Sequence, residues 1–420
     1  MTAILNNNDA NYALNLVKQV CTEVGPGLPG SSQERARAAI MQKELGSHLG
    51  TENVITEEFT MAPEAFLGSL PVSALFMLFA VLLNISLERF TGMPPWLISA
   101  IAFVFSSFSV LLITLEFILG FEFIDPLFKK ESSINVIGSL CRPGTQNVKR
   151  LLILSGHHDS APENTWLRLL GYGFLVFSAT WFIGLIAMLV ISVVQLTGVL
   201  TSNASIVHIG TLSWVMLAYP IAPSIIFAFF FTRGRKNGGT VPGAADNLSA
   251  CALVVTMCRF LSQNPSFIPY DTEIRFITFG SEEAGLRGSR SYVKRHLDEL
   301  KSLDAQLLNF ETVTYPEILI LSSDVSGTVK NSPEMVQSVV TAAKRAVVPY
   351  KVESASLGIA NDSGSFSKAG LKATTLLPFK MPQQMVAFYH QKWDVPENLT
   401  IEPLLNVLKL TFEWVRNSGE

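Results

Sequence analysis

Three long stretches without a charged side chain constrain this chain more than any other feature of its sequence. No charged residue occurs between Phe66 and Leu87, or between Phe90 and Leu115. Between Arg168 and Arg233 the only titratable base is His208. Because a bilayer core about 30 Å thick is crossed by about 20 apolar residues in a helix, the first two stretches predict one membrane span each and the third predicts two.

The four predicted spans form two hairpins, at residues 66–122 and 168–233, and the second breaks near residues 201–205. The alternative is a set of buried helices in a large soluble protein, but core helices seldom exceed about 14 fully apolar residues. Only 15 % of the residues are charged, against about 25 % in a typical soluble domain, which agrees with membrane spans. Residues 1–50 are polar and mixed in charge, so we expect no signal peptide there.

A hairpin returns the chain to the side that it left, so we expect the rest of the chain to lie on one side of the membrane. Arg89 is the only basic residue in the two loops that connect the predicted spans. The basic residues that flank the spans on the other side are Lys129, Lys130, Arg168, Arg233, Arg235 and Lys236. Because cytoplasmic flanks carry an excess of Lys and Arg, this distribution predicts an integral membrane protein with a cytoplasmic catalytic domain.

The remaining segments, 1–64, 123–165 and 234–420, alternate apolar strands with amphipathic helices. This alternation predicts one discontinuous α/β domain, a mixed sheet between two layers of helices (α/β/α). If the first three strands form an antiparallel meander that turns at residues 142–145, both insertions leave the same edge of the sheet. The predicted strands are 54–59, 133–140, 151–155, 273–279, 305–310, 318–321 and 373–377, and the predicted helices are 11–24, 32–49, 247–261, 285–300, 334–346 and 403–416.

Charge and cysteine content exclude some functions. A net charge of −3 gives no reason to expect a nucleic-acid partner. The four cysteines show no Cys-x-x-Cys pair, so we expect ordinary buried thiols rather than a disulfide framework or a thiolate zinc site. No feature of the sequence predicts an oligomeric state.

Most of the residues able to bind a metal ion fall in five short stretches. These are residues 156–160, 243–247, 281–285, 309–311 and 388–390. Three of them directly follow predicted strands, and ligands bind beyond the carboxyl ends of strands in open α/β sheets. Taken singly, each stretch has a structural explanation, such as a helix N-cap for Asp246 and Asn247. Together they hold enough histidines and carboxylates to bind two zinc ions.

The order of these motifs resembles the co-catalytic di-zinc aminopeptidase family, which also includes the glutaminyl cyclases. The motifs are His-x-Asp at 157–159, Gly-Ala-x-Asp-Asn at 243–247, Glu-Glu-x-Gly-Leu-x-Gly-Ser at 282–289, a later acidic residue, and Tyr-His at 389–390. The resemblance covers nearly all of the chain outside the predicted hairpins. It implies a zinc-peptidase domain, two Zn²⁺ ions and removal of N-terminal residues from peptides.

The resemblance also implies a role for each ligand. His157 and Glu283 would bind one zinc ion, and His390 would bind the second. Asp246 would bridge the two ions. Glu311 stands where the family usually has aspartate, and it would be the carboxylate ligand of the second zinc ion.

Other residues of these stretches would act on the reaction or on the ligands. Glu282 would be the general base, since it has to stay free to take a proton from the attacking water. Asp159 would orient His157, as metal-bound histidines usually require. Tyr389 and Asp362 are candidates for substrate contacts, although either could serve a structural role instead. We expect His158 to point away from the metals, and we interpret His48, His208 and His296 as structural.

The positions of the insertions lead to a hypothesis about substrate. If both hairpins leave the sheet edge that carries the ligands, the catalytic mouth faces the bilayer, and short, apolar or membrane-derived peptides are the expected substrates. Three alternatives stay open. One is acyl transfer of the glutaminyl-cyclase kind, and another is dipeptidase or endopeptidase activity at the same site. The third is a pseudoenzyme that binds peptides or serves as a scaffold, for which the departure at Glu311 is the main support.

Overall fold

The structure is a computed structural model that describes residues 5–85, 92–203, 212–221 and 240–418. The chain forms two compact units. Unit 1 comprises Met1–Pro63, Lys129–Glu163 and Thr240–Glu420, and unit 2 comprises Glu64–Phe128 and Asn164–Gly239.

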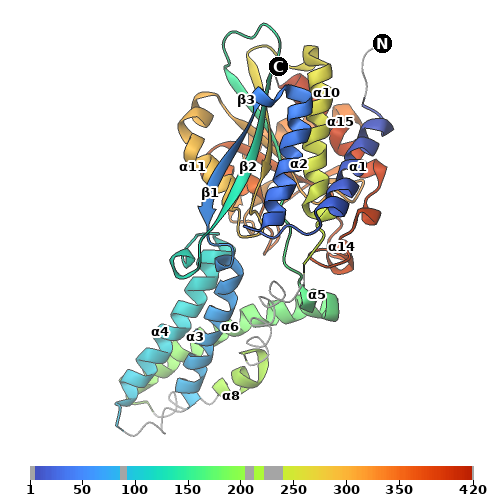
Figure 1. Cartoon of the computed structure of the whole chain (residues 1–420). Helices are drawn as coiled ribbons and strands as arrows, with labels where there is room; N and C mark the ends of the chain where they lie inside the picture. Colours follow the sequence, from blue (N-terminus) through green and yellow to red (C-terminus); the bar gives the residue numbers. More distant parts are fainter. Residues whose placement is uncertain (1–4, 86–91, 204–211, 222–239, 419–420) are drawn as a thin grey trace. The chain divides into compact units, whose positions relative to one another are not determined.

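Unit 1 is built on one eight-stranded mixed sheet with the strand order β1-β2-β4-β3-β5-β10-β6-β9 (Figure 1). The central strands β4, β3, β5 and β10 run parallel, whereas β2 is antiparallel to β4, and β6 is antiparallel to β10. The strands are β1 Val54–Met61, β2 Glu131–Cys141, β3 Arg150–His157, β4 Thr272–Phe279, β5 Gln306–Phe310, β6 Ile318–Leu321, β9 Tyr350–Glu353 and β10 Lys372–Leu377. The predicted mixed α/β sheet is therefore confirmed; β9 is a strand that the sequence analysis missed.

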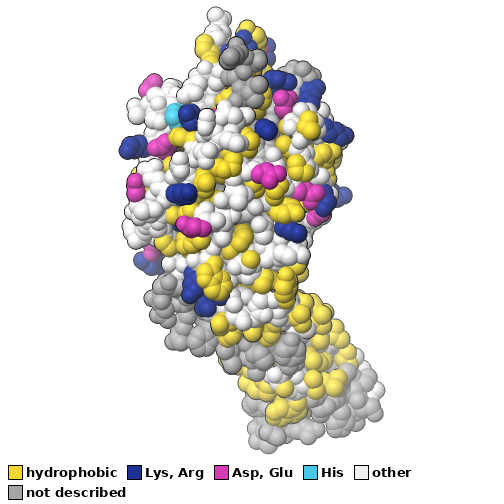
Figure 2. All heavy atoms as spheres, turned by 90° about the vertical axis from the view of Figure 1, so that its right-hand side faces the viewer, with side chains coloured by type: hydrophobic (Ala, Val, Ile, Leu, Met, Phe, Trp, Pro, Cys, Tyr) yellow, Lys and Arg dark blue, Asp and Glu magenta, His cyan; other side chains and the backbone are white. Residues whose placement is uncertain are grey.

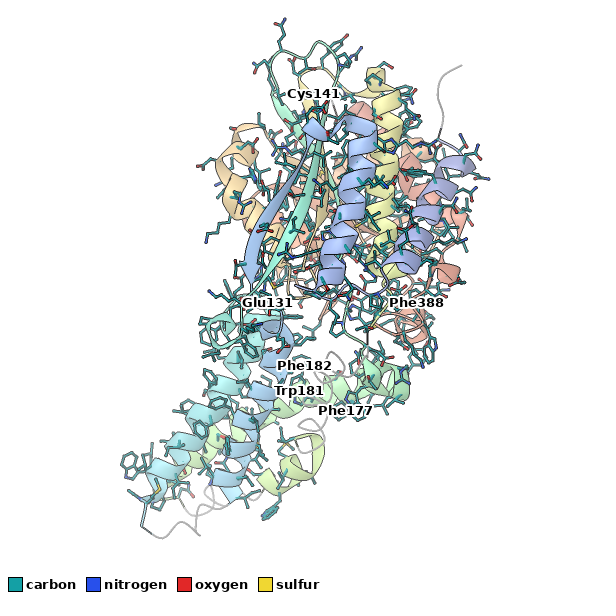
Figure 3. All side chains as sticks on the ribbon, in the orientation of Figure 1. Glu131, Cys141, Phe177, Trp181, Phe182 and Phe388 are labelled. Carbon is teal, nitrogen blue, oxygen red and sulfur yellow. The ribbon has the colours of Figure 1, made fainter. Side chains whose placement is uncertain are left out.

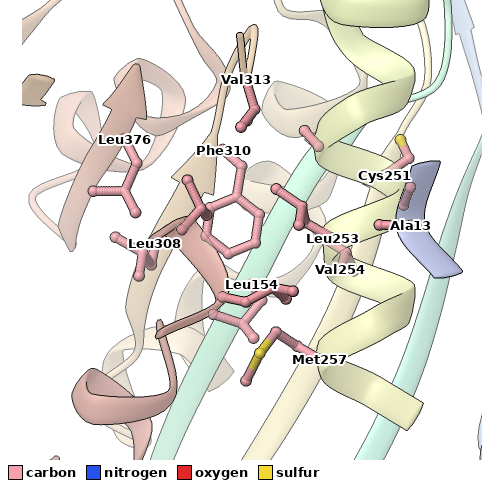
Figure 4. Packing of buried hydrophobic residues seen from close by; sticks show 14 of the residues in the cluster. Ala13, Leu154, Cys251, Leu253, Val254, Met257, Leu308, Phe310, Val313 and Leu376 are labelled. Carbon is pink, nitrogen blue, oxygen red and sulfur yellow. The ribbon is translucent and has the colours of Figure 1, made fainter. Parts of the chain in front are cut away.

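Helices cover both faces of this sheet. One face carries α1 (Asn7–Glu23), α2 (Ser32–Leu49), α10 (Ser249–Gln263), α12 (Pro333–Ala346) and α15 (Ile401–Asn417), and the other carries α11 (Arg287–Ser302) and α13 (Asp362–Lys368). Strand β3 shows why its sequence is continuously apolar: Leu152 and Leu154 enter the first core, while Leu151 and Ile153 enter the second. Figure 4 shows the first core, where α10 packs against the strands.

The first three strands do not form the meander considered from the sequence. Strand β4 lies between β2 and β3, although it follows them in sequence by more than one hundred residues. It is antiparallel to β2 and parallel to β3, so the carboxyl ends of β1, β3 and β4 still meet at one end of the sheet. Figure 3 shows Glu131, where β2 begins, at this end, and Cys141, where β2 finishes, at the opposite end. Both insertions therefore leave unit 1 at the end where β3 finishes.

Unit 2 consists of apolar helices that pack on one another. They are α3 (Ala65–Ile85), α4 (Pro95–Ile113), α5 (Thr165–Leu170), α6 (Tyr172–Leu200) and α8 (Ser213–Met216). Hydrogen bonds link them in pairs: Ser73 Oγ lies 2.8 Å from Ser109 Oγ of α4, and Asn84 Nδ2 donates to Ser192 Oγ of α6 at 2.9 Å. On the face shown in Figure 2, hydrophobic side chains dominate the described surface of unit 2, while charged side chains are scattered over unit 1.

Four helices in the described ranges are long and apolar enough to cross a membrane: Ala65–Ile85, Pro95–Ile118, Tyr172–Leu200 and Ala244–Gln263. The first three coincide with three of the predicted spans. The fourth is α10 with its preceding turn; its apolar stretch is 94 % buried inside the structure, as befits a core helix of unit 1 rather than a lipid-facing span. Most of the predicted fourth span lies outside the described residues, at 204–211 and 222–239.

Candidate metal centre

Five side chains from five separate segments converge at the end of the sheet where β3, β4 and β5 finish. His157 is the last residue of β3, and Glu283 and Glu311 follow β4 and β5. Asp246 lies in the turn that precedes α10, and His390 follows α14 (Gln383–Ala387). Phe388, two residues before His390, appears at this end of unit 1 in Figure 3. The structure thus brings together all five residues that the sequence analysis proposed as metal ligands.

Asp246 lies between the two histidines. Its Oδ1 is 3.3 Å from His157 Nε2, and its Oδ2 is 3.0 Å from His390 Nε2. Glu311 Oε1 lies 3.6 Å from His157 Nε2, and Glu283 Oε1 lies 3.3 Å from His390 Nε2. Potential ligand atoms therefore form two groups that share Asp246, one with His157 and Glu311 and the other with Glu283 and His390.

This grouping differs from the expected assignment of the two glutamates. The resemblance pairs His157 with Glu283 and His390 with Glu311, whereas the shortest contacts exchange the two carboxylates. The reason is the strand order: β3 and β5 are neighbours, with Ser155 opposite Asn309, so His157 and Glu311 each follow two residues later. A third group, of His157, Glu282 and Glu283, also brings Glu283 near His157.

The distances among these atoms fit zinc. Zinc is bound tetrahedrally at about 2.0–2.1 Å by histidine and carboxylate, which places neighbouring ligand atoms about 3.3–3.4 Å apart. The four contacts around Asp246 range from 3.0 to 3.6 Å. In addition, Asp246 Oδ2 and Glu283 Oε1 are buried, accept no hydrogen bond of regular geometry from the described residues, and both lie against the single Nε2 of His390, so a bound cation would satisfy them better.

The electrostatics of the centre also call for a cation. Burial lowers the pKa of His390, but Glu283 and Asp246 outweigh it and raise the pKa to about 10. Burial raises the pKa of Glu311 to about 8, although His157 opposes the shift. The buried carboxylates thus keep site residues protonated, and a bound divalent ion would displace these protons.

Glu282 stands beside the two groups rather than in them. Its Oε2 lies 3.7 Å from His157 Nε2, and 9 % of the residue is exposed. Burial raises its pKa well above the usual value; His157 opposes this shift, while Glu283 and Glu311 add to it. A carboxylate with a raised pKa at the edge of a metal group is suited to accept a proton near neutral pH.

Asp159 supports both His157 and the Glu282–Glu283 turn. Its Oδ1 lies 3.2 Å from His157 Nδ1, the ring nitrogen that faces away from Asp246. The same carboxylate accepts hydrogen bonds from the backbone N–H groups of Glu282 and Glu283, each at 3.0 Å. One buried side chain therefore orients a histidine and the turn that carries two further site residues.

Two supporting residues were not identified from the sequence. Asn247 Nδ2 donates to Glu311 Oε2 at 3.0 Å, while its Oδ1 accepts from Thr312 N at 3.1 Å. Asp394 accepts from Ala245 N at 2.7 Å and from Asp246 N at 3.1 Å. The Asp394 carboxylate thus holds the turn that carries Asp246. No local pattern announces this contact, because the partners are far apart in sequence.

The remaining candidates occupy less direct positions. The Tyr389 ring stacks on the His390 ring, with centroids 3.9 Å apart. Asp362 is fully buried, and burial raises its pKa to about 7, so it has no surface to offer a substrate in this structure. His158 is also fully buried, and burial lowers its pKa to about 4.

Comparisons with known sequences point to one family. Residues 229–415 match the model of peptidase family M28. Aminopeptidase YwaD of Bacillus subtilis is 49 % identical over 69 residues, a stretch that spans 16 % of this chain and 14 % of that relative.

Solved structures share the fold at low sequence identity. The zinc aminopeptidase BSAP of Bacillus subtilis has a TM-score of 0.55 at 16 % identity, covering 97 % of this chain and 95 % of its own. A glutaminyl cyclase of Fimbriiglobus ruber has a TM-score of 0.54 at 12 % identity, covering 99 % and 96 %. Residues 229–415 of the chain are thus similar to peptidase family M28, and the chain has the mixed-sheet fold of these zinc aminopeptidases and glutaminyl cyclases.

Proposed function

We propose that this protein is a membrane-bound zinc aminopeptidase that binds two zinc ions and hydrolyses N-terminal residues from peptides. The observation that carries the proposal is the position of Asp246 between His157 and His390, each of which has its own glutamate. The match of residues 229–415 to a peptidase family supports hydrolysis, and the similarity to aminopeptidase YwaD and to the zinc aminopeptidase BSAP supports removal of N-terminal residues.

In the proposed reaction the protein supplies proton transfer and positioning. Bound zinc ions polarise a substrate carbonyl and lower the pKa of a water molecule. Glu282 accepts the proton of the attacking water and delivers it to the leaving amine. Asp159 orients His157 and holds the Glu282–Glu283 turn through its hydrogen bonds. Asp394 holds the turn of Asp246 in the same way.

We also propose that the substrates are short, apolar or membrane-derived peptides and that unit 1 is cytoplasmic. Three helices of unit 2 have the length and composition of membrane spans, which supports a bilayer as partner. Both insertions join unit 1 at the end of the sheet that carries the ligands. The basic residues that flank the predicted spans support the cytoplasmic side.

A second candidate is acyl transfer of the glutaminyl-cyclase kind, since glutaminyl cyclases share this fold. Five candidate ligands in two groups favour the aminopeptidase, because they could bind a second ion that a single-zinc enzyme does not need. The two functions differ in product: hydrolysis releases a free amino acid, whereas cyclisation releases ammonia from an N-terminal glutamine.

The test compares zinc content and hydrolysis of aminoacyl substrates in the detergent-purified wild type and in Glu282→Gln. We expect about two zinc ions in both proteins and a loss of hydrolysis of about 100-fold or more in the variant, since it lacks the proton acceptor. Glu44→Gln, on α2 and hydrogen-bonded to Tyr12, is the matched control. Zinc binding without hydrolysis of any peptide would reject the aminopeptidase, and ammonia release from a glutaminyl peptide would replace it with the cyclase.

A further inference from the structure

Helix α2 carries two charged side chains that are completely buried. Glu34 and Arg37 have 0 % exposure, and they lie one helical turn apart. The helix precedes residues 229–415, which match the family model. Burying a carboxylate and a guanidinium costs free energy unless each group is hydrogen-bonded inside the protein.

Arg37 donates hydrogen bonds to backbone carbonyls of three separate segments. Its Nη1 bonds to His158 O at 3.2 Å, its Nη2 bonds to Pro242 O at 2.6 Å, and its Nε bonds to Gly25 O at 2.9 Å. Within the described ranges it makes no ion pair with a carboxylate. The guanidinium therefore serves as a bridge between backbone segments.

The segments that Arg37 joins are two ligand-bearing turns. His158 directly follows His157, and Pro242 precedes Asp246 by four residues. These turns are also the two ends of unit 1 between which residues 164–239 are inserted. An isolated bridge between Pro162 and Thr240 is a further contact across this gap. Arg37 thus holds His157 and Asp246 together across an insertion of more than seventy residues.

Glu34 performs the equivalent task for the turn that carries the glutamates. Its Oε1 accepts hydrogen bonds from Ser281 Oγ at 2.7 Å and from Ser133 Oγ of β2 at 2.9 Å, and its Oε2 accepts from Gly30 N at 2.7 Å. Ser281 directly precedes Glu282 and has a φ of +53°, a left-handed conformation that is uncommon for a residue with a side chain. The bond to Glu34 stabilises this conformation at the start of the turn.

We propose that Glu34 and Arg37 are positioning residues of the metal centre. Their hydrogen bonds hold the turns that carry His157, Asp246 and Glu283 and so set the distances between these ligands. The inference rests on the proposed zinc site and extends it to a helix that supplies no ligand. Because the ligands come from separate segments, a shift of one turn changes several ligand distances at once. Substitution of Glu34 or Arg37 therefore weakens zinc binding although every ligand is still present.

A purely structural role for these residues predicts a different result. If Glu34 and Arg37 only stabilise the fold, their substitution lowers the melting temperature of the metal-free and the zinc-loaded protein by the same amount. If they position the ligands, substitution also shrinks the increase in melting temperature that zinc causes, because that increase reports the affinity of the folded protein for the ion.

The experiment uses the full chain in detergent and the variants Arg37→Lys, Glu34→Gln and Ser281→Ala. The first two are conservative in size, and Ser281→Ala removes one hydrogen bond while leaving Glu34 bonded to Ser133 and Gly30. The matched controls on the same helix are Arg35→Lys, whose side chain bonds to Glu58 and Ser132 O, and Glu44→Gln. Zinc affinity is measured by competition with a chelator, and melting temperature is measured with and without zinc.

We expect the three variants to bind zinc about 10–100-fold more weakly and to gain less melting temperature from it, while both controls match the wild type. Affinity equal to that of the wild type in all three, or an equal fall in melting temperature with and without zinc, would overturn the positioning role. If Arg37→Lys does not fold, Glu34→Gln and Ser281→Ala decide the matter. A wild type that binds zinc but hydrolyses nothing would reject the proposed activity and leave this inference standing, whereas one that binds no zinc would reject both.

Discussion

Glu311 shows how the surroundings of a ligand determine which side chain fits. Its backbone N–H donates to Leu376 O of β10 at 2.9 Å, which fixes the start of the side chain. Its two oxygens then face different partners: Oε2 accepts from Asn247, and Oε1 lies 3.6 Å from His157 Nε2 and accepts from Thr312 Oγ1 at 3.1 Å. The longer side chain that departs from the family's usual aspartate is therefore held in place at the metal group.

From this geometry we expect Glu311→Asp to weaken binding of the zinc ion on the His157 side. The shorter side chain withdraws the carboxylate by about one carbon–carbon bond, about 1.5 Å, from a backbone position that β10 fixes. We expect about tenfold weaker binding of one of the two ions. Zinc stoichiometry during chelator titration measures this, with the exposed Glu334→Asp as the control. Two ions of unchanged affinity in the variant would show that the carboxylate reaches the metal from either length.

The protonation of the centre leads to a second expectation at the scale of residues. Without metal, the carboxylates raise the pKa of His390 to about 10 and hold the pKa of His157 well above its usual value, although burial acts to lower both. At pH 7 both histidines are then imidazolium cations, and zinc has to displace one proton from each. Zinc binding should therefore release protons, and its affinity should rise as the pH increases from about 6 to about 9.

Calorimetry of zinc binding in buffers with different ionisation enthalpies measures the number of protons released. We expect about two or more for the filled centre, one from each histidine. A heat of binding that is independent of the buffer would contradict this protonation state.

At the scale of elements, α10 shows how composition alone can mislead. Its sequence is apolar enough for a membrane span, yet almost all of its surface is buried between the sheet and helices α1, α2 and α15. Figure 4 shows Leu253, Val254 and Met257 packed against Leu154 and Phe310. A helix enclosed on all sides in a protein core needs the same all-round apolar surface as a helix in lipid.

We therefore expect Leu253→Ala to destabilise unit 1 by about 2–5 kcal/mol, since it opens a cavity in a packed core. Val176→Ala on α6, where the side chain is 64 % exposed, should change stability by less than about 0.5 kcal/mol. Thermal unfolding monitored by circular dichroism in detergent compares the two variants. Equal and small effects would mean that α10 is not enclosed as the structure has it.

At the scale of the whole molecule, two insertions of apolar helices interrupt unit 1 without disturbing its sheet. Each begins and ends at the same end of the sheet, so the strands on either side keep their pairing. If both insertions are membrane hairpins, as we propose, each returns the chain to the side that it left, and we expect every segment of unit 1 to lie on one side of the membrane.

Cysteine labelling in intact cells tests that topology. In a background without the four native cysteines, we place one cysteine at Tyr270 of unit 1, which is 68 % exposed, or at Met93 between α3 and α4, which is 42 % exposed. With a cytoplasmic unit 1, an impermeant maleimide should label Met93→Cys from outside and Tyr270→Cys only after permeabilisation. The reverse pattern would invert the orientation, and labelling of both from one side would reject the hairpins.

Features that depend on local composition and on the order of residues could be predicted before the structure was known. The charge-free stretches around Phe66–Leu87 and Phe90–Leu115 predicted helices long enough to cross a bilayer, because burial in lipid excludes charge. The alternation of apolar strands and amphipathic helices predicted a mixed sheet with helices on both faces, since each periodicity marks the face that has to be buried. The order of the short polar motifs, through its resemblance to a known family, predicted which residues would be metal ligands, and the structure brings these five residues together.

Which of these elements are neighbours became known only from the folded chain. Strand β4 enters between β2 and β3, a pairing between distant segments that no local pattern encodes. The adjacency of β3 and β5 brings Glu311 within 3.6 Å of His157. Glu34 and Arg37 look like ordinary surface charges of a helix until the fold encloses them. Such contacts depend on the free energy of packing the whole chain, so their partners become visible only when the chain is folded.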